Sequence, residues 1–525
     1  MNEHSKKKSI SKKAVAVIAA VAFLLLAAAA VFMMYAAQGL FYPVQGSCGE
    51  NAQWSFEDGI LRIRGSGRVS APPEWQRISD RVTSLEMNSG ITELDRELFR
   101  DFGSIESADI PQTVKKIGAY AFMGCESLKK IKLPAGLTTI EPYTFDGCVS
   151  LEKINIPNGV RTIDTAAFTR CRSADTIDIP KTVSSIGDWA FYECTSVKKI
   201  DLPPGLSEIG ENAFGKCSSL SVIDLPKGIT EIRSRVFSYC PSLVTVSGGT
   251  INKIEPFAFT GCNRLETISF KVNCEEIGNY AFKDCGALSD FVFSPELKKI
   301  GEYSFSGCGS LKKITIPKNV GTISYNAFSD CESLSELTLE SGIRKIDGYT
   351  FYNCTSLKSA DIPDSVQYLG DSVFEGCTAL KSVHFSKNTK IIGSNAFYGC
   401  EKLRVAELPD SVASLGEYAF FGCKSMTSAV LPTRLTRLEN GIFFGCEKLG
   451  NVSLPEKIKY IGDSVFDGCV SMSSINIPSG VRYIGDSVFS GTKATQKIYM
   501  NVKSSASSSW NENWDYDCHA QLIWS

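Results

Sequence analysis

The sequence predicts a solenoid, in which one short structural unit is copied end to end around a shared apolar interior. Three observations predict this fold: a phenylalanine that recurs at a fixed interval, apolar and cysteine columns that repeat with it, and a short alternating segment that is followed by proline in most copies. Sixteen of the seventeen intervals between the recurring phenylalanines are 23 residues long, and the other is 22. The recurring residues are Phe99, Phe122, Phe145, Phe168, Phe191, Phe214, Phe237, Phe259, Phe282, Phe305, Phe328, Phe351, Phe374, Phe397, Phe420, Phe443, Phe466 and Phe489.

The chain begins with a basic segment that precedes an apolar run. Residues 1–13 contain five lysines and one glutamate, and the 24 residues 14–37 carry no charged side chain. A helix of that length, at ~1.5 Å per residue, can cross a bilayer. Because positive residues stay on the cytoplasmic side, we expect residues 1–13 to form a cytoplasmic tail and residues 14–37 a transmembrane signal-anchor helix. The alternative is a cleaved signal peptide, which would leave a secreted protein.

Residues 38–98 are expected to form a linker and an N-terminal cap, because the end coil of a solenoid would otherwise expose its apolar face. Alternating apolar residues flank Asp58 and Gly59, a pair that favours a tight turn, so the cap should contain a β-hairpin. Residues 492–525 should form the C-terminal cap, closed by Trp510, Trp514 and Trp524. A carbohydrate-binding tail that uses these tryptophans is the alternative.

Residues 99–491 are expected to form the repeats themselves. In the type copy, Ile131 and Leu133 flank Lys132, an alternation that predicts a short strand with its apolar side facing inward. Proline follows in twelve of the seventeen copies and should end the strand, because it lacks an amide donor. The stretch that follows has apolar residues three to five apart, so we predict a helical turn. The fold class is thus an α/β solenoid of about 17 right-handed coils, each a parallel strand plus a helical turn.

Two columns of the repeat contain only residues suited to a dry interior. The column of Ile140 holds isoleucine or leucine in every copy. Stacked cysteines point in one direction, whereas a disulfide needs its Cβ atoms ~3.8 Å apart and turned toward each other, so we read the cysteine column as small buried hydrophobes. No CxxC pair accompanies it, and we expect no metal there. The cysteine column contains Cys125, Cys148, Cys171, Cys194, Cys217, Cys240, Cys262, Cys285, Cys308, Cys331, Cys354, Cys377, Cys400, Cys423, Cys446 and Cys469.

The repeated pattern I-x-L-P-x-x-L-x-x-I-x-x-x-x-F-x-x-C-x-x-L resembles the BspA-like subtype of leucine-rich repeats found in bacterial surface proteins. The resemblance covers most of the chain, from about Phe99 to Gly491. It implies a leucine-rich-repeat superhelix and a role at the cell surface. It implies little about the ligand, because the shared residues are the buried ones.

We expect the strand face to be concave and to carry the candidate ligand surface. Two groups stand out in its exposed column. Asp178, Asp201 and Asp224 are like charges on consecutive coils, which is costly unless a cation or a basic partner is near, and Lys198 and Lys199 could supply one. The second group, with a histidine between two carboxylates, could bind a divalent metal or titrate. It consists of Asp361, His384 and Glu407. For both groups the alternative is an ordinary solvated face.

Two further features concern surfaces. Aromatic residues such as Tyr120, Trp189 and Tyr280 recur two positions before the repeated phenylalanine, on the side that we expect to be convex. They either contact glycans or proteins or cover the seams between coils. The single 22-residue interval and the Gly248-Gly249 pair predict a bend or loosening over residues 245–295.

Catalysis finds little support in the sequence. The three histidines are His4, His384 and His519, and no HExxH, GxSxG or P-loop pattern occurs. We expect no cofactor, and the mildly acidic exterior part argues against nucleic acid. Three hypotheses follow: a membrane-anchored surface protein that binds or adheres to other proteins, a glycan- or cell-wall-binding module, and a hydrolase with an unrecognised site.

Overall fold

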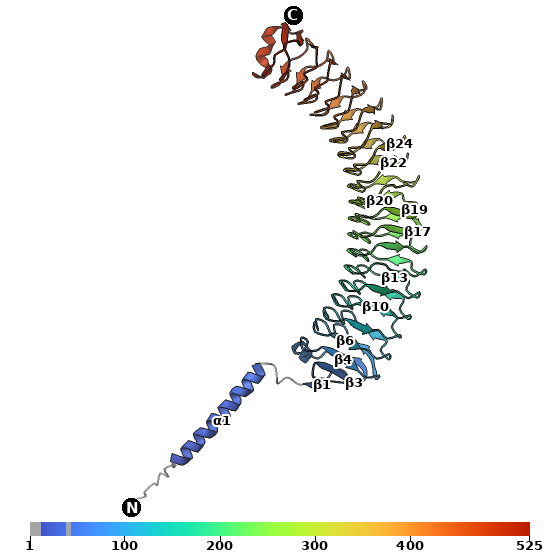
Figure 1. The fold of residues 1–525 in the computed structure, drawn as a ribbon, viewed down its shortest axis with the longest axis vertical. Coiled ribbons are helices and arrows are strands. Elements are labelled where there is room, and N and C mark those ends of the chain that lie inside the picture. The colour runs from blue at the N-terminus through green and yellow to red at the C-terminus, as the bar shows by residue number, and fades with distance from the viewer. Residues whose placement is uncertain (1–11, 38–43, 525) are drawn as a thin grey trace, which may run out of the picture.

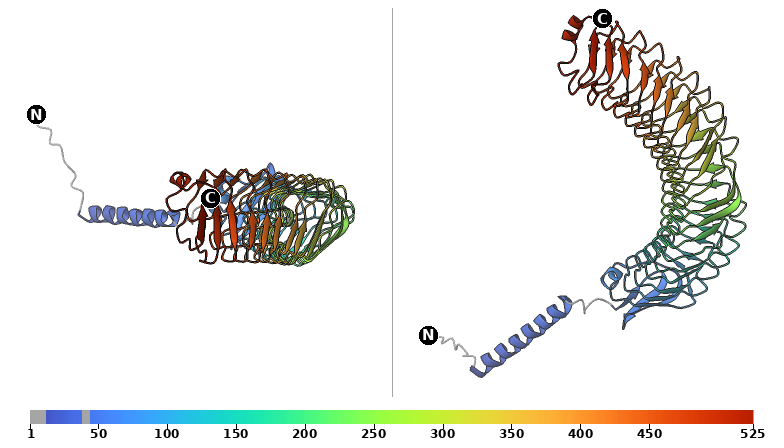
Figure 2. Two further views of the ribbon diagram at one scale, coloured as in Figure 1. Left: turned by 90° about the horizontal axis from the view of Figure 1, so that it is seen from above. Right: turned by 45° about the horizontal axis from the view of Figure 1, so that its top comes forward.

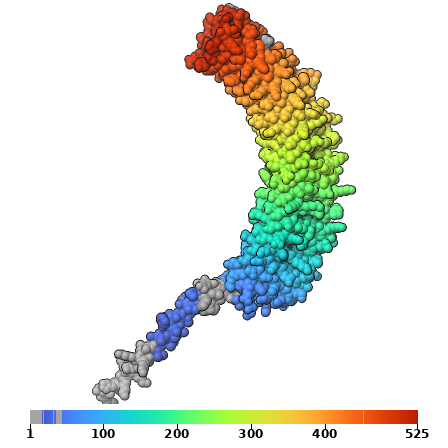
Figure 3. Space-filling model, in the orientation of Figure 1, coloured from blue at the N-terminus to red at the C-terminus, as the bar shows by residue number. Residues whose placement is uncertain are grey.

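The computed structural model describes residues 12–37 and 44–524, which comprise helix α1 (Lys12–Ala37) and a curved solenoid of short strands (Figure 1). Figure 3 shows the solenoid as one continuous crescent. The predicted solenoid of stacked parallel strands is confirmed by the strand pairing, because consecutive coils align residue for residue, as in Ile154 opposite Ile177.

The N-terminal segment is helical, as expected for residues 14–37. Across residues 12–37 and 44–524, however, no helix combines the length and the hydropathy that crossing a bilayer requires. Residues 1–11 of the predicted tail 1–13 and several side chains of α1 lie outside the described residues, so the predictions of a cytoplasmic tail and a membrane span fall partly there.

The N-terminal cap contains the predicted hairpin, in which β2 (Asn51–Glu57) and β3 (Ile60–Val69) pair antiparallel. Asp58 and Gly59 form the turn with φ of 49° and 78°, values that suit a two-residue hairpin loop. Strand β1 (Gln45–Ser47) and the 3₁₀ helix η1 (Pro73–Arg77) complete the cap. Trp75 of η1 is buried and stacks on Phe99 with ring centroids 5.5 Å apart. The cap thereby closes the apolar interior at its first coil.

A first strand row begins each coil and contains the alternating segment around Lys132. Its inward residues, such as Ile154, are buried, and the neighbours on either side are exposed. The row consists of β4 (Ser84–Met87), β6 (Ser107–Asp109), β8 (Lys130–Lys132), β10 (Lys153–Asn155), β12 (Thr176–Asp178), β15 (Val222–Asp224), β17 (Thr245–Ile251), β19 (Thr267–Val272), β22 (Lys313–Ile316), β24 (Glu336–Leu339), β26 (Ser359–Asp361), β28 (Ser382–His384), β30 (Val405–Glu407), β32 (Ser428–Val430), β34 (Asn451–Ser453), β36 (Ser474–Ile477), β38 (Lys497–Met500) and β39 (Gln521–Trp524).

A second strand row ends in the buried column of Ile140. Nine of its strands, from β16 to β31, form one unbroken sheet. The row consists of β5 (Ile91–Leu94), β7 (Lys116–Ile117), β9 (Thr139–Ile140), β11 (Thr162–Ile163), β13 (Ser185–Ile186), β14 (Glu208–Ile209), β16 (Glu231–Ile232), β18 (Lys253–Ile254), β20 (Glu276–Ile277), β21 (Lys299–Ile300), β23 (Thr322–Ile323), β25 (Lys345–Ile346), β27 (Tyr368–Leu369), β29 (Ile391–Ile392), β31 (Ser414–Leu415), β33 (Arg437–Leu438), β35 (Tyr460–Ile461) and β37 (Tyr483–Ile484). Because both rows start before residue 99 and the first row extends beyond 491, the solenoid is longer than the predicted repeat region.

The predicted helical turn is wrong in its detail, because residues 44–524 contain no α-helix. Each coil instead has a turn row in which the backbone twice enters the left-handed region, for example at Tyr120 (φ 62°) and Gly124 (φ 73°). These reversals prevent a helix from continuing. The amides at and between them donate to the next coil, as Phe122 does to the Thr144 carbonyl at 2.9 Å. Intervening amides bond three residues back, which explains why the apolar spacing resembled a helix.

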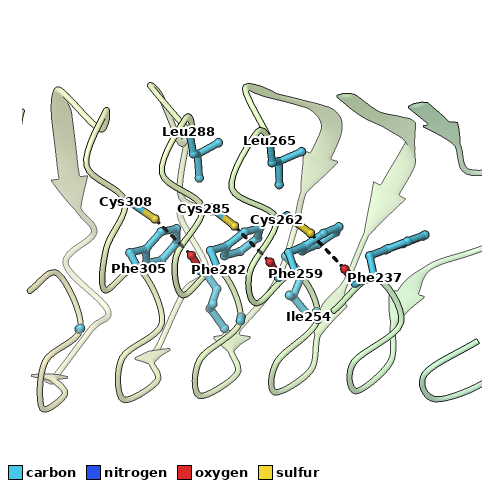
Figure 4. Packing of buried hydrophobic residues seen from close by; sticks show 14 of the residues in the cluster. Phe237, Ile254, Phe259, Cys262, Leu265, Phe282, Cys285, Leu288, Phe305 and Cys308 are labelled. Atoms are coloured by element: carbon cyan, nitrogen blue, oxygen red, sulfur yellow. Dashed lines mark hydrogen bonds between the residues drawn. The ribbon is translucent and has the colours of Figure 1, made fainter. Parts of the chain in front are cut away.

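The interior is built from the predicted rows of phenylalanine, cysteine, isoleucine and leucine (Figure 4). The phenylalanine rings stack along the axis, for example Phe168 on Phe191 with centroids 5.6 Å apart and planes at 2°. Every member of the cysteine column is buried, as is Cys274. Each thiol donates to the phenylalanine carbonyl of the preceding coil, as Cys285 does to Phe259 at 3.2 Å. Cysteine therefore fills the volume of a small hydrophobe and also provides a weak donor between coils.

The arc has its first strand row on the convex side and its turn row on the concave side (Figures 1 and 2). The expectation of a concave strand face is therefore wrong. Rings of the turn row are more closely spaced than the rings behind them: Tyr120 and Tyr143 are 4.8 Å apart, whereas Phe122 and Phe145 are 5.5 Å apart. Where helices back a solenoid, their ~8–10 Å spacing exceeds the ~4.8 Å of strands and forces the strands inside. Tight turns remove that constraint.

The irregular stretch at residues 245–295 does not loosen the interior. The rings of Phe237 and Phe259 remain stacked at 5.5 Å despite the shortened interval, and the pairing of β17 with β19 absorbs the change as a register shift between Ser247 and Thr250. One coil farther on, residues 289–293 form no strand, and no backbone hydrogen bond joins residues 290–293 to a neighbouring coil in this fully described stretch. We call residues 289–293 the wedge segment.

The C-terminal cap closes the other end with aromatic residues, as predicted. It contains the 3₁₀ helix η2 (Ser504–Ser509) and strand β39. Trp514 meets the last ring of the stack, Phe489, edge to face at 6.4 Å. Trp510 packs on Trp514 at 5.2 Å, and both are buried.

Candidate ligand-binding surface

The three consecutive aspartates lie on the convex strand face and are all exposed. Asp201 has a partner from its own coil, as expected, because the Lys199 ammonium lies 2.7 Å from its carboxylate. Asp224 accepts a hydrogen bond of 2.7 Å from the Ser247 hydroxyl. Such exposed ion pairs are weak, so the group keeps most of its negative potential. We call Asp178, Asp201 and Asp224 the acidic strip.

The histidine group is only partly assembled. His384 Nδ1 lies 2.5 Å from Asp361 Oδ1, across the paired strands β26 and β28, and both side chains are more than three-quarters exposed. Glu407 is exposed on β30, and among the described residues it makes no hydrogen bond or ion pair with His384 or Asp361. Within residues 12–37 and 44–524, no group of three or more metal-ligating side chains has suitable geometry. Of the predicted group, the structure therefore brings together His384 and Asp361 alone.

A basic hollow escaped the sequence reasoning. It has a volume of about 670 Å³ on the strand face between β4 and β10, and its lining includes Lys130, Lys132 and Lys153. Small residues of the neighbouring coils, such as Ser107 and Ala108, form part of its lining. None of the three ammonium groups has a carboxylate within 4 Å among the described residues. Lys130 and Lys132 lie on one coil and Lys153 on the next, so the sequence contained a cluster of like charges comparable to that of the aspartates.

Two smaller hollows flank the wedge segment. They measure about 460 Å³ toward β19 and about 320 Å³ toward β22. Between them Val292 is 75% exposed, whereas the rings of Phe291 and Phe293 on either side are buried. This apolar protrusion lies on a column whose other exposed valine is Val430 on β32, at 56% exposure.

The recurring aromatics line the concave turn face, and several of them stack on one another, whereas Trp189 is 39% exposed and meets Tyr192 edge to face. Phe257, Tyr280 and Tyr303 form a continuous row with centroids 4.8 and 4.9 Å apart and planes within 5°. The guanidinium of Arg235 covers the free face of Phe257 at 4.3 Å. In this row, the ring faces that would stack on a sugar are therefore occupied by neighbouring rings or, on Phe257, by the guanidinium. This arrangement favours the seam-covering interpretation.

The buried thiols cannot serve as nucleophiles. Burial raises the pKa of Cys194 to about 12 and that of Cys48 to about 11. Because the thiolate is the reactive form, these side chains are inert at neutral pH.

The fold and the exposed surface define a class: a leucine-rich-repeat solenoid with an invariant interior and a variable face. The chain belongs to the family described as BspA type leucine rich repeat region, whose six-copy profile matches residues 79–175, 163–289, 275–404 and 390–511. The predicted resemblance is confirmed.

Three of the solved structures that match this chain come from bacterial proteins. A protein from Bacteroides ovatus is 23% identical over 91% of this chain and 99% of its own, with a TM-score of 0.43. A leucine rich cell surface protein from Faecalibacterium prausnitzii is 21% identical over 80% and 95%, with a TM-score of 0.34. The pneumococcal vaccine antigen PcpA is 15% identical over 92% and 99%, with a TM-score of 0.25. Comparison with curated proteins returned no match.

Proposed function

We propose that this chain is an extracellular binding protein that adheres to other proteins through the exposed faces of its solenoid. One observation carries the proposal: the interior columns hold the same few residue types along the whole arc, whereas the exposed column of the strand face varies from coil to coil. A scaffold that repeats its core and varies its surface presents an extended recognition surface. Membership of the BspA type family supports this reading.

Binding fits the surface better than catalysis does. The two described histidines are both exposed. His384 pairs with Asp361, and His519 of the C-terminal cap lies 3.8 Å from Asp517. Neither contacts a serine or cysteine nucleophile in the hydrogen bonds of the described residues. General-base activation of a nucleophile needs such contact. The proposal therefore assigns no catalytic residue and no cofactor.

The proposal includes a membrane anchor at residues 14–37, with residues 1–13 cytoplasmic and the solenoid outside. The uncharged sequence of this segment and the five lysines before it support the anchor. The full chain should then remain with membranes after extraction at alkaline pH, and a chain that lacks residues 1–37 should be released. Release of the full chain with a shortened N-terminus would instead favour a cleaved signal peptide.

A glycan-binding role is the second candidate, and the ring geometry weighs against it. Phe257, Tyr280 and Tyr303 of the turn face stack face to face, and Trp510 and Trp514 are buried in the cap. Probing the protein against arrays of surface and matrix proteins and against glycan arrays separates the two roles. Binding to proteins that is weakened by substitutions on the strand face supports the proposal, whereas binding to glycans alone contradicts it.

A further inference from the structure

The turn row joins neighbouring coils along the whole repeat region. Each repeated phenylalanine from Phe99 to Phe466 donates its amide proton to a carbonyl of the next coil, at 2.7–3.1 Å. The series continues through the coils beside the wedge segment, where Phe259 donates at 2.7 Å and Phe282 at 2.8 Å. Because these bonds lie on the concave side of the arc (Figure 1), they fix the spacing of the coils on that side.

The first strand row, on the convex side, is interrupted instead. Within residues 44–524 its strands pair only in groups, and no pairing of strands joins one group to the next. An isolated bridge between Lys199 and Val222 lies in one of the breaks. We call each break between neighbouring groups a gap. After the cap sheet, which ends at β8, the groups are β10 with β12, β15 to β19, β22 with β24, β26 with β28, β30 to β34, and β36 to β39.

Four hollows of the strand face lie at these gaps. The largest, of about 670 Å³, reaches from β4 to β10 and includes the gap after β8. The two hollows beside the wedge segment lie between β19 and β22. The fourth, of about 430 Å³, is lined by Leu202 and Pro204 of a coil that forms no strand in the first row. The strand face is therefore open at places where the sheet is interrupted.

The curvature of the arc explains why the gaps lie on the convex side. That side is longer than the concave side, and ring spacing already increases from 4.8 Å between Tyr120 and Tyr143 to 5.5 Å between Phe122 and Phe145. Paired strands lie ~4.8 Å apart, so the strands of the longer side cannot all pair. Strands within a group keep that spacing, and the additional length collects in the gaps.

We infer that the solenoid changes its curvature by opening and closing these gaps, with the turn row as the line about which neighbouring coils rotate. Strands that approach to ~4.8 Å gain backbone hydrogen bonds, whereas separated strands leave the same groups to water, so each gap has two distinct arrangements. Closing a gap straightens the arc, and opening one bends it further. Rigid groups that move about a hinge are a common basis of conformational change. Such bending does not depend on which partner the solenoid binds.

The wedge segment is the place where this bending is best defined. No backbone hydrogen bond joins residues 290–293 to either neighbouring coil in this fully described stretch. Phe291 packs between Phe282 and Phe305, at 5.1 and 4.9 Å from their centroids, and so holds the segment out of the sheet. The second strand row remains paired over the same coils, from β20 to β21. The first row should therefore change its length here while the second row keeps its own.

The experiment measures two distances over the same coils by pulsed electron paramagnetic resonance of the spin-labelled full chain in detergent micelles. One label pair, Asp224→Cys with Thr338→Cys, spans the wedge segment along the first strand row. The control pair, Thr230→Cys with Arg344→Cys, spans the same five coil steps beside the unbroken second sheet. All four side chains are exposed, and the native cysteines are buried except Cys518, which is replaced by serine in every sample.

The first-row pair should give a broad distribution of distances and the control pair a narrow one, since label flexibility is common to both. Five steps of a fully paired row would measure ~24 Å. The double variant Phe291→Ile and Phe293→Leu should shorten and narrow the first-row distance toward that value and leave the control distance unchanged. Circular dichroism verifies that each variant is folded.

Three results would overturn the inference. The first is a first-row distribution as narrow as that of the control pair, which needs no change at the wedge segment and can be read in the chain with native Phe291 and Phe293. The second is a first-row distance that the double variant leaves unaltered. The third is an equal change in both distances, which would mean that the coils move apart as a whole and do not rotate about the turn row.

Discussion

A regular coil and the wedge coil differ at two inward apolar positions and at the buried position that follows, which is Pro134 in the first and Ser294 in the second. In the regular coil Ile131 and Leu133 face the interior and the segment joins the sheet as β8. In the wedge coil Phe291 and Phe293 occupy those positions. Phe291 lies between Phe282 and Phe305, at 5.1 and 4.9 Å from their centroids. The extra rings occupy space beside the phenylalanine stack, and the segment forms no strand.

The difference is confined to one row of the coil. The second strand row runs through the wedge coil unbroken, since β20 pairs with β21 in register. The turn row also continues, with Phe282 donating to the Ser304 carbonyl at 2.8 Å. Only the first strand row is lost. The first strand row is the least constrained of the three, since residues 200–202 also form no strand although their inward residues are the aliphatic Ile200 and Leu202. Overfilling of a close-packed interior should displace such an element first.

The largest expected effect comes from removing one stacked ring in each region. Phe191→Ala in the regular stack should lower the free energy of unfolding by about 3–5 kcal/mol. Phe305→Ala should cost less, because Phe291 and Phe293 can move into the space. Chemical denaturation monitored by tyrosine fluorescence measures both. An equal or larger loss at Phe305 would show that the wedge is not overfilled.

Alkaline pH should destabilise both regions equally, since the thiol row passes through each. Burial raises the pKa of Cys194 to about 12 from its ordinary 9.0, and burial raises the pKa of Cys308 as well. The folded state therefore holds its protons more tightly, so the stabilisation is complete below pH 9 and is lost as pH rises toward the folded pKa. Each thiol should contribute about 1.4 kcal/mol per pH unit above 9. Cys194→Ala and Cys308→Ala should each reduce the slope of stability against pH by the same amount.

Replacing the wedge rings should restore the missing strand. In the double variant Phe291→Ile and Phe293→Leu, the amides of residues 290–293 should become protected from hydrogen exchange, as those of β22 are expected to be already. The global stability should change by less than about 1.5 kcal/mol, because lost ring contacts offset relieved crowding. Amides that still exchange rapidly would show that another feature keeps the segment out of the sheet.

The smallest effect concerns the turn face, which is alike in both regions. Arg96 covers Tyr120 at 4.8 Å in the regular part, and Arg235 covers Phe257 at 4.3 Å near the wedge. Arg96→Ala and Arg235→Ala should each cost about 0.5–1 kcal/mol. Thermal unfolding of the two variants provides the comparison, and clearly unequal losses would indicate that the wedge alters the concave face too.

Much of the fold could be predicted because the interior is periodic. The columns of Phe122, Cys125 and Ile140 repeat without a polar residue, and a repeated apolar column can only be an interior stack. The turn row could not be predicted, because left-handed backbone at bulky residues such as Tyr120 has no local sequence signal and depends on hydrogen bonds to the next coil. The sign of the curvature follows from that same row.

The candidate site was less accessible to sequence reasoning. Exposure of Asp178 and the partner of Asp201 followed from the alternation and from the nearby Lys199. The basic hollow did not, because its shape depends on the small residues Ser107 and Ala108 of a neighbouring coil. The geometry of His384 with Asp361 but without Glu407 depends on side-chain rotamers, which column order does not specify.

The direction of the hydrogen bonds between coils has a mechanical consequence. Strands and turn segments run across the solenoid, so the bonds that join one coil to the next, such as Phe122 to Thr144, point along its length. A pull on the two ends would load them in series and peel coils away one at a time. Each detached 23-residue coil would release ~80 Å of extended chain, at up to ~3.6 Å per residue. Under load, a solenoid built in this way would lengthen before the full force reached its contact with a partner.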